Sequence, residues 1–262
     1  MLDCPNFITF VNSNFVIRDD EPQVDTLCLF NDKVSFPRLM ALEVKGCGKW
    51  KKIWPDKLTP DSFGYFKFFK LDQCRGFSSI FPSSMVDRLQ ELESLEISHC
   101  DDLESIIEPP RLSSIESSSK FVFSKVRWMK LKSLSQLKSF YPSMHTTEWP
   151  SLEKLRVTGC SNAKIFALES PNSQLDHVPV GAKQPLFGFS KEAFPCLEKL
   201  KTDQDEAKEI LELANYQGVQ FIEEEDDDDD VYFDDYFDDF NDSLLRCTVD
   251  DIIYRGRRRK MK

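Results

Sequence analysis

The sequence contains no run of eighteen consecutive apolar residues, so it predicts no transmembrane helix. Its first ten residues, MLDCPNFITF, lack a basic flank and a long apolar core, so we expect no secretory signal peptide. No C-x-x-C pair is present, which argues against a zinc cluster. The sequence therefore predicts a protein that neither spans a membrane nor binds a structural metal.

Residues that could support catalysis are scarce. The three histidines, His99, His145 and His177, lie far apart and show neither metal-ligand spacing nor pairing with a nucleophile. Carboxylates are plentiful, but no pattern pairs them. We therefore predict a non-enzymatic binding protein without catalytic residues, cofactor or metal.

The negative charge is concentrated at one end of the chain. From position 223 onward there are fifteen acidic and seven basic residues, a net charge of −8 out of −11 for the whole chain. The segment 223–242, EEEDDDDDVYFDDYFDDFND, is of low complexity and predicts disorder. We expect 218–262 to be an acidic, largely disordered tail ending in a basic cluster, Arg255-Gly-Arg-Arg-Arg-Lys.

The stretch from Leu92 to Ile107, LESLEISHCDDLESII, follows the pattern L-x-x-L-x-L-x-x-C. Because alternate residues of a strand share one face, Leu95 and Ile97 predict a short strand with one buried face, and Cys100 turns the chain out of it. Four further copies have their pattern positions at Leu39, Leu42, Val44 and Cys47; Phe66, Phe69, Leu71 and Cys74; Val126, Met129, Leu131 and Leu134; and Leu152, Leu155, Val157 and Cys160. A sixth copy begins at Leu197 and Leu200 and then decays.

Successive turn positions are 27, 26, 34 and 26 residues apart, which is typical of leucine-rich repeats. The predicted fold class is α/β: a leucine-rich-repeat solenoid. We expect a curved parallel β-sheet of short strands on its concave face and irregular or short helical returns on its convex face.

The repeat domain is predicted to cover residues 1–217. Its first repeat is incomplete, because Cys4, Phe7 and Phe10 match the turn and the following steps without a preceding strand. This pattern favours the end of a longer repeat array, or a truncated product, over a loose N-terminal segment, and it would leave the first strand without a polar cap.

Other parts of the domain depart from the repeat. Segments 11–35, 108–120 and 167–190 are predicted loops, and 85–92 is a predicted short helix. Residues 203–217 predict an amphipathic helix that closes the last strand, with Asp203 and Glu206 resembling a capping box.

Five cysteines, Cys4, Cys47, Cys74, Cys100 and Cys160, occupy the turn slot, where a small, weakly hydrogen-bonding side chain fits. We interpret them as reduced, which favours an intracellular protein. The expected location is the cytoplasm, with the nucleus as an alternative if the C-terminal basic cluster is an import signal.

Three phrases carry a closer resemblance: FPRLMALEVKGCGKWKKIW, LESLEISHCDDLESIIE and, most of all, LKSFYPSMHTTEWPSLEKLRVTGCSNAKIF, whose SFYP…EWPSL part is more specific than the generic repeat. They resemble the C-terminal leucine-rich-repeat region of plant disease-resistance proteins of the coiled-coil, nucleotide-binding class, over roughly residues 1–211. The resemblance implies intracellular sensing of pathogen effectors, with the repeats as recognition surface and as a brake on the nucleotide-binding domain. Unlike that family, this chain has no G-x-x-x-x-G-K-[ST] phosphate loop and no coiled coil ahead of the repeats, so ATP-driven switching within it is not supported.

The residues that flank the inward pair of each strand should face outward from the concave sheet. The predicted partner-binding surface consists of Glu43, Lys45, Phe68, Lys70, Asp72, Glu96, Trp128, Lys130, Lys132, Lys154, Arg156, Lys199 and Lys201. Basic residues dominate the last three strands, which predicts an acidic protein partner, with Trp128 and Phe68 as aromatic anchors. The lysines could instead merely keep the sheet soluble.

The predicted partner is a protein: a pathogen effector, a guarded host protein or a receptor's nucleotide-binding domain. A small-molecule substrate or a nucleic acid is not expected. The chain could alternatively be an adaptor or decoy, or a degenerate receptor fragment. A further hypothesis is that 223–242 folds back over Lys130, Lys154, Arg156 and Lys199 and competes with an acidic partner; a free, solvated tail is the alternative.

Overall fold

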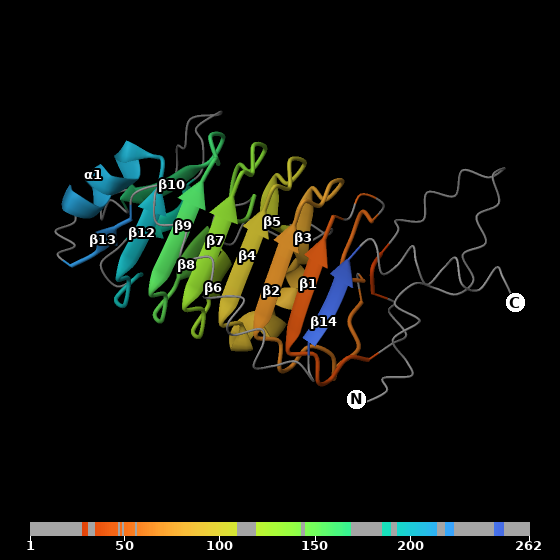
Figure 1. Ribbon diagram of the computed structural model, residues 1–262. Helices are drawn as coiled ribbons and strands as arrows, with labels where there is room; N and C mark the ends of the chain where they lie inside the picture. The colour runs from red at the N-terminus through yellow and green to blue at the C-terminus, as the bar shows by residue number, and fades with distance from the viewer. Residues whose placement is uncertain are drawn as a thin grey trace, which may run out of the picture.

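Figure 1 shows the computed structural model of the protein. The structure describes residues 28–30, 35–46, 48, 50–55, 57–108, 119–142, 145–168, 185–189, 193–213, 218–222 and 244–248. No helix within these ranges is long and apolar enough to span a membrane. The predicted loops 11–35, 108–120 and 167–190 lie mostly outside the described residues, as do Cys4 and Cys47.

One large parallel sheet of eight strands forms a face of the molecule (Figure 1). Six strands are the repeat strands: β1 (Ala41–Lys45), β2 (Phe68–Asp72), β4 (Ser94–Ser98), β7 (Trp128–Lys132), β9 (Lys154–Thr158) and β12 (Lys199–Thr202). They lie side by side in chain order, as the repeat spacing predicts. The predicted leucine-rich-repeat solenoid is confirmed.

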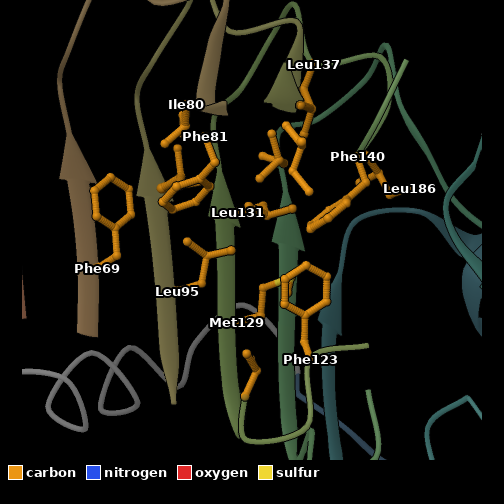
Figure 2. Close-up of a cluster of buried hydrophobic side chains, with 14 of the residues drawn as sticks. Phe69, Ile80, Phe81, Leu95, Phe123, Met129, Leu131, Leu137, Phe140 and Leu186 are labelled. Carbon is orange, nitrogen blue, oxygen red and sulfur yellow. The ribbon is translucent and has the colours of Figure 1, made fainter. Parts of the chain in front are cut away.

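The alternating pattern of each repeat strand explains which side of the sheet carries the core. In β4, Leu95 and Ile97 are buried, and the equivalent residues of all the other repeat strands are buried as well. Figure 2 shows Leu95, Met129 and Leu131 converging with Ile80 and Phe81 from the opposite layer. Five of the repeat strands therefore contribute two apolar side chains each to one continuous core, whereas β12 contributes Leu200 and has the buried Thr202 at its second inward position.

The turn after each repeat strand uses a left-handed backbone. Gly46, Gln73, His99, Ser133 and Gly159 hold equivalent positions and have φ between 53° and 67°. The N–H groups of the first four extend the sheet's hydrogen bonding; for example, the Gln73 N–H donates to the Ser98 carbonyl at 3.0 Å. The Gly159 N–H donates to the Asp203 carboxylate instead, at 2.7 Å. The left-handed residue turns the chain while its backbone group stays paired.

The described cysteines that follow a repeat turn, Cys74, Cys100 and Cys160, are buried and weakly hydrogen-bonded. The Cys74 thiol donates to the Asp72 carbonyl at 3.3 Å, and the Cys100 thiol donates to the Ser98 carbonyl at 3.3 Å. Burial raises the pKa of Cys100 to about 12 and that of Cys160 to about 11. These thiols therefore remain neutral donors in the slot that the sequence assigned to them.

The returns on the other side of the core contain more strand than the sequence predicted. Three small parallel sheets pair β3 (Ser79–Pro82) with β5 (Ser105–Glu108), β6 (Ser119–Val122) with β8 (His145–Glu148), and β10 (Lys164–Leu168) with β11 (Pro185–Phe189). The predicted short helix is confirmed as the 3₁₀-helix η1 (Ser83–Glu91). Irregular returns were expected because the three-residue apolar steps there suit several backbone conformations.

Aromatic rings fill the space between the two layers. Trp149 stacks on Phe123 with ring centroids 4.3 Å apart, and Trp54 stacks on Phe30 at 5.0 Å. Phe187 meets Trp149 edge-on at 5.6 Å. The core is thus held by large rings as well as by the repeat leucines.

After β12 the chain forms helix α1 (Asp205–Leu213), which begins two residues after the predicted start at 203; residues 214–217 of the prediction lie outside the described residues. Its apolar stripe of Ala207, Ile210 and Leu211 is buried, as expected. The predicted capping box is wrong, because both carboxylates contact the preceding repeat instead: Asp203 accepts from the Gly159 N–H, and Glu206 pairs with Lys164.

Two short strands from the predicted tail join the large sheet. β13 (Gln220–Phe221) pairs with β12 at one end, and β14 (Leu244–Thr248) pairs with β1 at the other. The expectation of an uncapped first strand is therefore wrong, since β14 covers that edge. Residues 223–243 and 249–262, on which the predictions of disorder, fold-back and an import signal rest, lie outside the described residues.

Candidate protein interface

The concave face is the side of the large sheet that points away from the core. Register places its side chains in rows that run across the strands. The first row is Ala41, Phe68, Ser94, Trp128, Lys154 and Lys199; the second is Glu43, Lys70, Glu96, Lys130, Arg156 and Lys201; the third is Lys45, Asp72, Ser98, Lys132 and Thr158. All thirteen predicted interface residues lie in these rows.

The second row changes character halfway across the sheet. Its first half alternates in sign, and Lys70 Nζ lies 3.9 Å from Glu96 Oε2. Its second half places Lys130, Arg156 and Lys201 on adjacent strands in direct register. Basic side chains so close together create a strip of positive potential on this half of the face.

The second row is also more enclosed than its outward direction suggests. Glu96 is 2% exposed, Lys130 7%, and Arg156 and Lys201 5% each. Half-buried lysines flank these residues: Lys154 and Lys199 in the first row and Lys132 in the third. A partner would therefore meet the flanking lysines before the central residues.

The two predicted aromatic anchors are not accessible. Phe68 and Trp128 are each only 3% exposed. The Trp128 indole N–H donates to Glu96 Oε1 at 3.0 Å, and Lys154 Nζ lies 5.6 Å from the centre of the Trp128 ring. The expectation that these rings anchor a partner assumed that every outward-facing ring is exposed, whereas neighbouring side chains enclose both.

Sequence reasoning missed a cluster at the carboxyl ends of the first strands. His99 Nδ1 lies within hydrogen-bonding distance of Asp72 Oδ1, at 3.0 Å. Lys45 Nζ lies 3.2 Å from Oδ2 of the same carboxylate. His99 reaches Asp72 because it occupies the left-handed turn position after β4. In the sequence it was only an isolated histidine beside the repeat turn.

A second unpredicted feature is a series of ion pairs at the opposite edge, where the strands begin. Lys67 pairs with Glu93 at 2.7 Å and Arg127 pairs with Glu153 at 2.7 Å, in each case across neighbouring repeats. Arg127, Glu153 and Cys196 line an open hollow of about 340 Å³ there. The signal in the sequence was a charged residue directly before each of β2, β4, β7, β9 and β12.

The described residues contain no group of three or more histidine, cysteine, aspartate or glutamate side chains that could hold a metal ion. A second open hollow, of about 400 Å³, lies beside the start of α1 and is lined by Lys164, Asp203 and Gln204 among others. The geometry is that of an extended surface, which suits a macromolecular partner.

A family model described as plant disease resistance protein RPS2-like, leucine-rich repeats, matches residues 38–180. The matched range covers more than half of the chain and runs from the approach to β1 to beyond β10. No curated protein and no solved structure matches the chain significantly.

Proposed function

Because the chain belongs to the RPS2-like leucine-rich repeats of plant disease resistance proteins, we propose that it is a recognition module of plant defence that binds an acidic protein surface. Repeats of this family are a non-enzymatic module for protein interaction. The observation that carries the finer proposal is the run of basic residues on β7, β9 and β12 of the concave face.

The half-buried lysines of that run are the proposed contact residues. Lys132, Lys154 and Lys199 flank the enclosed centre of the strip and reach solvent. A desolvated ion pair between one of them and a partner's carboxylate would contribute mainly to specificity and association rate. The proposed partner is a pathogen effector, a guarded host protein or a receptor's nucleotide-binding domain, and we propose that binding takes place in the cytoplasm or nucleus.

The experiment compares two variants of equal charge. In the first, Lys132, Lys154 and Lys199 are replaced by Glu. In the control, Lys120, Lys125 and Lys138 are replaced by Glu; these exposed lysines lie off the concave face and pair with single carboxylates. Each immobilised chain is used to capture proteins from extracts of infected and uninfected leaves, and captured proteins are identified by mass spectrometry.

We expect at least one acidic protein to bind the wild-type and control chains and to be lost from the concave-face variant. Its sequence, identified by mass spectrometry, distinguishes a pathogen effector from a host protein of the kind that an adaptor or decoy would bind. A captured set that is the same for all three chains would refute the concave face as the interface.

A further inference from the structure

The acidic segment 223–243 lies outside the described residues, but the chain on either side of it is paired in the large sheet. β13, which ends at Phe221, pairs with β12, and β14, which begins at Leu244, pairs with β1. These two strands lie at opposite ends of the row of eight strands (Figure 1). Seven strand spacings separate them, or about 34 Å along the sheet. The connection between them therefore has to span the length of the sheet.

The length of this connection favours a direct path over the surface. From Ile222 to Leu244 there are 22 peptide units, and a flexible chain of that length has an average end-to-end distance of about 25 Å. The two paired strands thus hold the ends farther apart than their average separation. One side of the sheet is filled by the core. The remaining paths cross the concave face or follow one edge of the sheet.

The charges favour the path across the concave face. The segment 223–243 has thirteen carboxylates and no basic residue. The edge where the strands end has carboxylates at its turns, Asp102 and Asp203 among them, which would repel the segment. The edge where the strands begin has cations that already pair with carboxylates across repeats, as Lys67 does with Glu93. The concave face instead has a run of cations on adjacent strands.

This run, which we call the basic strip, consists of Lys130 on β7, Arg156 on β9 and Lys201 on β12. Register places Arg156 directly between the other two. Each of the three is at most 7% exposed, although its side chain leaves the sheet on the side away from the core. Enclosed cations are stable when anions lie beside them. The basic strip therefore suits an acidic occupant.

The acidic run of the segment starts at the level of the basic strip. Phe221 is in register with Leu200, and the Ile222 N–H donates to the Leu200 carbonyl at 3.0 Å, so Ile222 comes level with Lys201. Eight consecutive carboxylates, residues 223–230, follow directly. Three strand spacings, about 14 Å, separate β13 from β7, and eight extended residues reach about 26 Å. This run is therefore long enough to pass all three cations.

We propose that residues 223–230 occupy the concave face over β7, β9 and β12, with their carboxylates against the basic strip. The contact forms within one chain, because the strands on both sides of the segment belong to the same sheet. The segment then competes with an acidic protein partner for this half of the face. Only the competition, and not the contact, rests on the proposed function.

The first test detects the contact itself. A carbodiimide joins a carboxylate to an amine without a spacer, so it links only groups that touch. The full chain is treated at low ionic strength and in about 1 M salt, where surface charges are screened, and links within the monomer are identified by mass spectrometry. We expect links from 223–230 to Lys130, Lys154 or Lys201 that are lost in high salt. Equal linking of 223–230 to the exposed lysines off the face, Lys120, Lys125 and Lys138, would overturn the contact.

The second test compares two variants that each remove five negative charges. In one, the five aspartates of 226–230 are replaced by Asn; in the matched control, the replaced aspartates are Asp234, Asp235, Asp238, Asp239 and Asp242. The probe is a fluorescent poly-glutamate peptide, titrated at low ionic strength. The first variant should bind it about tenfold more tightly than the wild type, because a tethered competitor has been weakened, and the control should stay close to the wild type. Equal tightening in both variants, or no binding by any chain, would contradict the proposal.

The two tests fail separately from the proposed function. A chain that forms the expected links and shows the expected change in probe binding, but captures no acidic protein from leaf extracts, retains the contact and loses the proposed function. A chain that captures an acidic partner without forming these links retains the proposed function and loses the contact.

Discussion

The indole N–H of Trp128 on β7 donates a hydrogen bond of 3.0 Å to Oε1 of Glu96 on β4, and both side chains are buried on the concave face. A buried carboxylate is costly unless donors compensate for its lost hydration. Within the described residues, Lys70 also lies close to Glu96. The pair therefore fixes the middle of the face rather than presenting an aromatic ring to a partner.

Replacing Trp128 by Phe should lower the free energy of unfolding by about 1–3 kcal/mol, because the buried carboxylate loses a donor. Urea denaturation measures the change. The matched comparison is the same substitution in a Glu96→Gln background, where the cost should be smaller. Because glutamine can still accept from the indole N–H, equal costs in both backgrounds would show that the carboxylate's charge adds nothing to this hydrogen bond.

The buried turn thiols should make stability fall at alkaline pH. The pKa values of Cys100 and Cys160 are raised to about 12 and about 11, from an ordinary value of 9.0, chiefly by burial. A raised folded-state pKa means that the contribution is complete below about pH 9 and is lost as pH rises toward 11–12. Each thiol should cost about 1.4 kcal/mol per pH unit in this window.

The double variant Cys100→Ala/Cys160→Ala isolates this effect from the titration of lysine and tyrosine. Its free energy of unfolding, measured by urea denaturation from pH 8 to pH 11, should decline less steeply than that of the wild type. Parallel declines in the two proteins would show that these thiols do not titrate differently on unfolding.

Substitutions at two equivalent left-handed turn positions, Gly159 and Ser133, should change the free energy of unfolding by different amounts. A Cβ at Gly159, where φ is +66°, would lie 3.0 Å from the Cα of Ser133, so Gly159→Ala should destabilise by about 1–3 kcal/mol. Ser133→Gly should stay within about 1 kcal/mol of the wild type, since relief of left-handed strain offsets the entropy of glycine.

Gly64→Ala is the control for the turn series, because nothing lies within 4 Å of its added Cβ. Thermal unfolding of the three variants should rank Gly159→Ala well below the other two. If Gly159→Ala melts with Gly64→Ala, the turn tolerates a side chain and the steric argument fails.

The aromatic core should tolerate loss of an indole nitrogen better than loss of a ring. Within the described residues, Trp149 Nε1 is buried without a hydrogen-bond partner. Trp149→Phe removes that unsatisfied donor while keeping an aromatic ring against Phe123, so it should cost less than about 2 kcal/mol. Phe123→Ala should cost about 3–5 kcal/mol because it leaves a cavity beside Trp149. Urea denaturation that reverses this order would contradict the packing account.

The repeat pattern predicted the sheet well because its information is local. Leu95 and Ile97 lie two residues apart, so their placement on one face follows from strand geometry alone. The slot of Cys100 is defined by residues within the same repeat, and the spacing of the copies determines chain order across the sheet. The thirteen predicted interface residues share one face for the same reason.

The strands of the returns could not be predicted in this way. Ile80 and Ile106 each lie six residues after a turn cysteine, at the second of two three-residue apolar steps, and both are buried. Whether the backbone there pairs depends on the neighbouring repeat, as β3 does with β5. The short polar and apolar runs of the returns do not carry that information.

The sequence by itself determined a parallel leucine-rich-repeat solenoid, its inward residues and the side on which its basic residues lie, because repeat periodicity specifies these features within each unit. Only the tertiary structure decided that Trp128 is enclosed against Glu96 and that β14 covers β1. Both depend on contacts between residues far apart in the chain. Trp128 is buried by side chains of neighbouring strands, and the open edge of β1 is paired by a strand from near the other end of the chain.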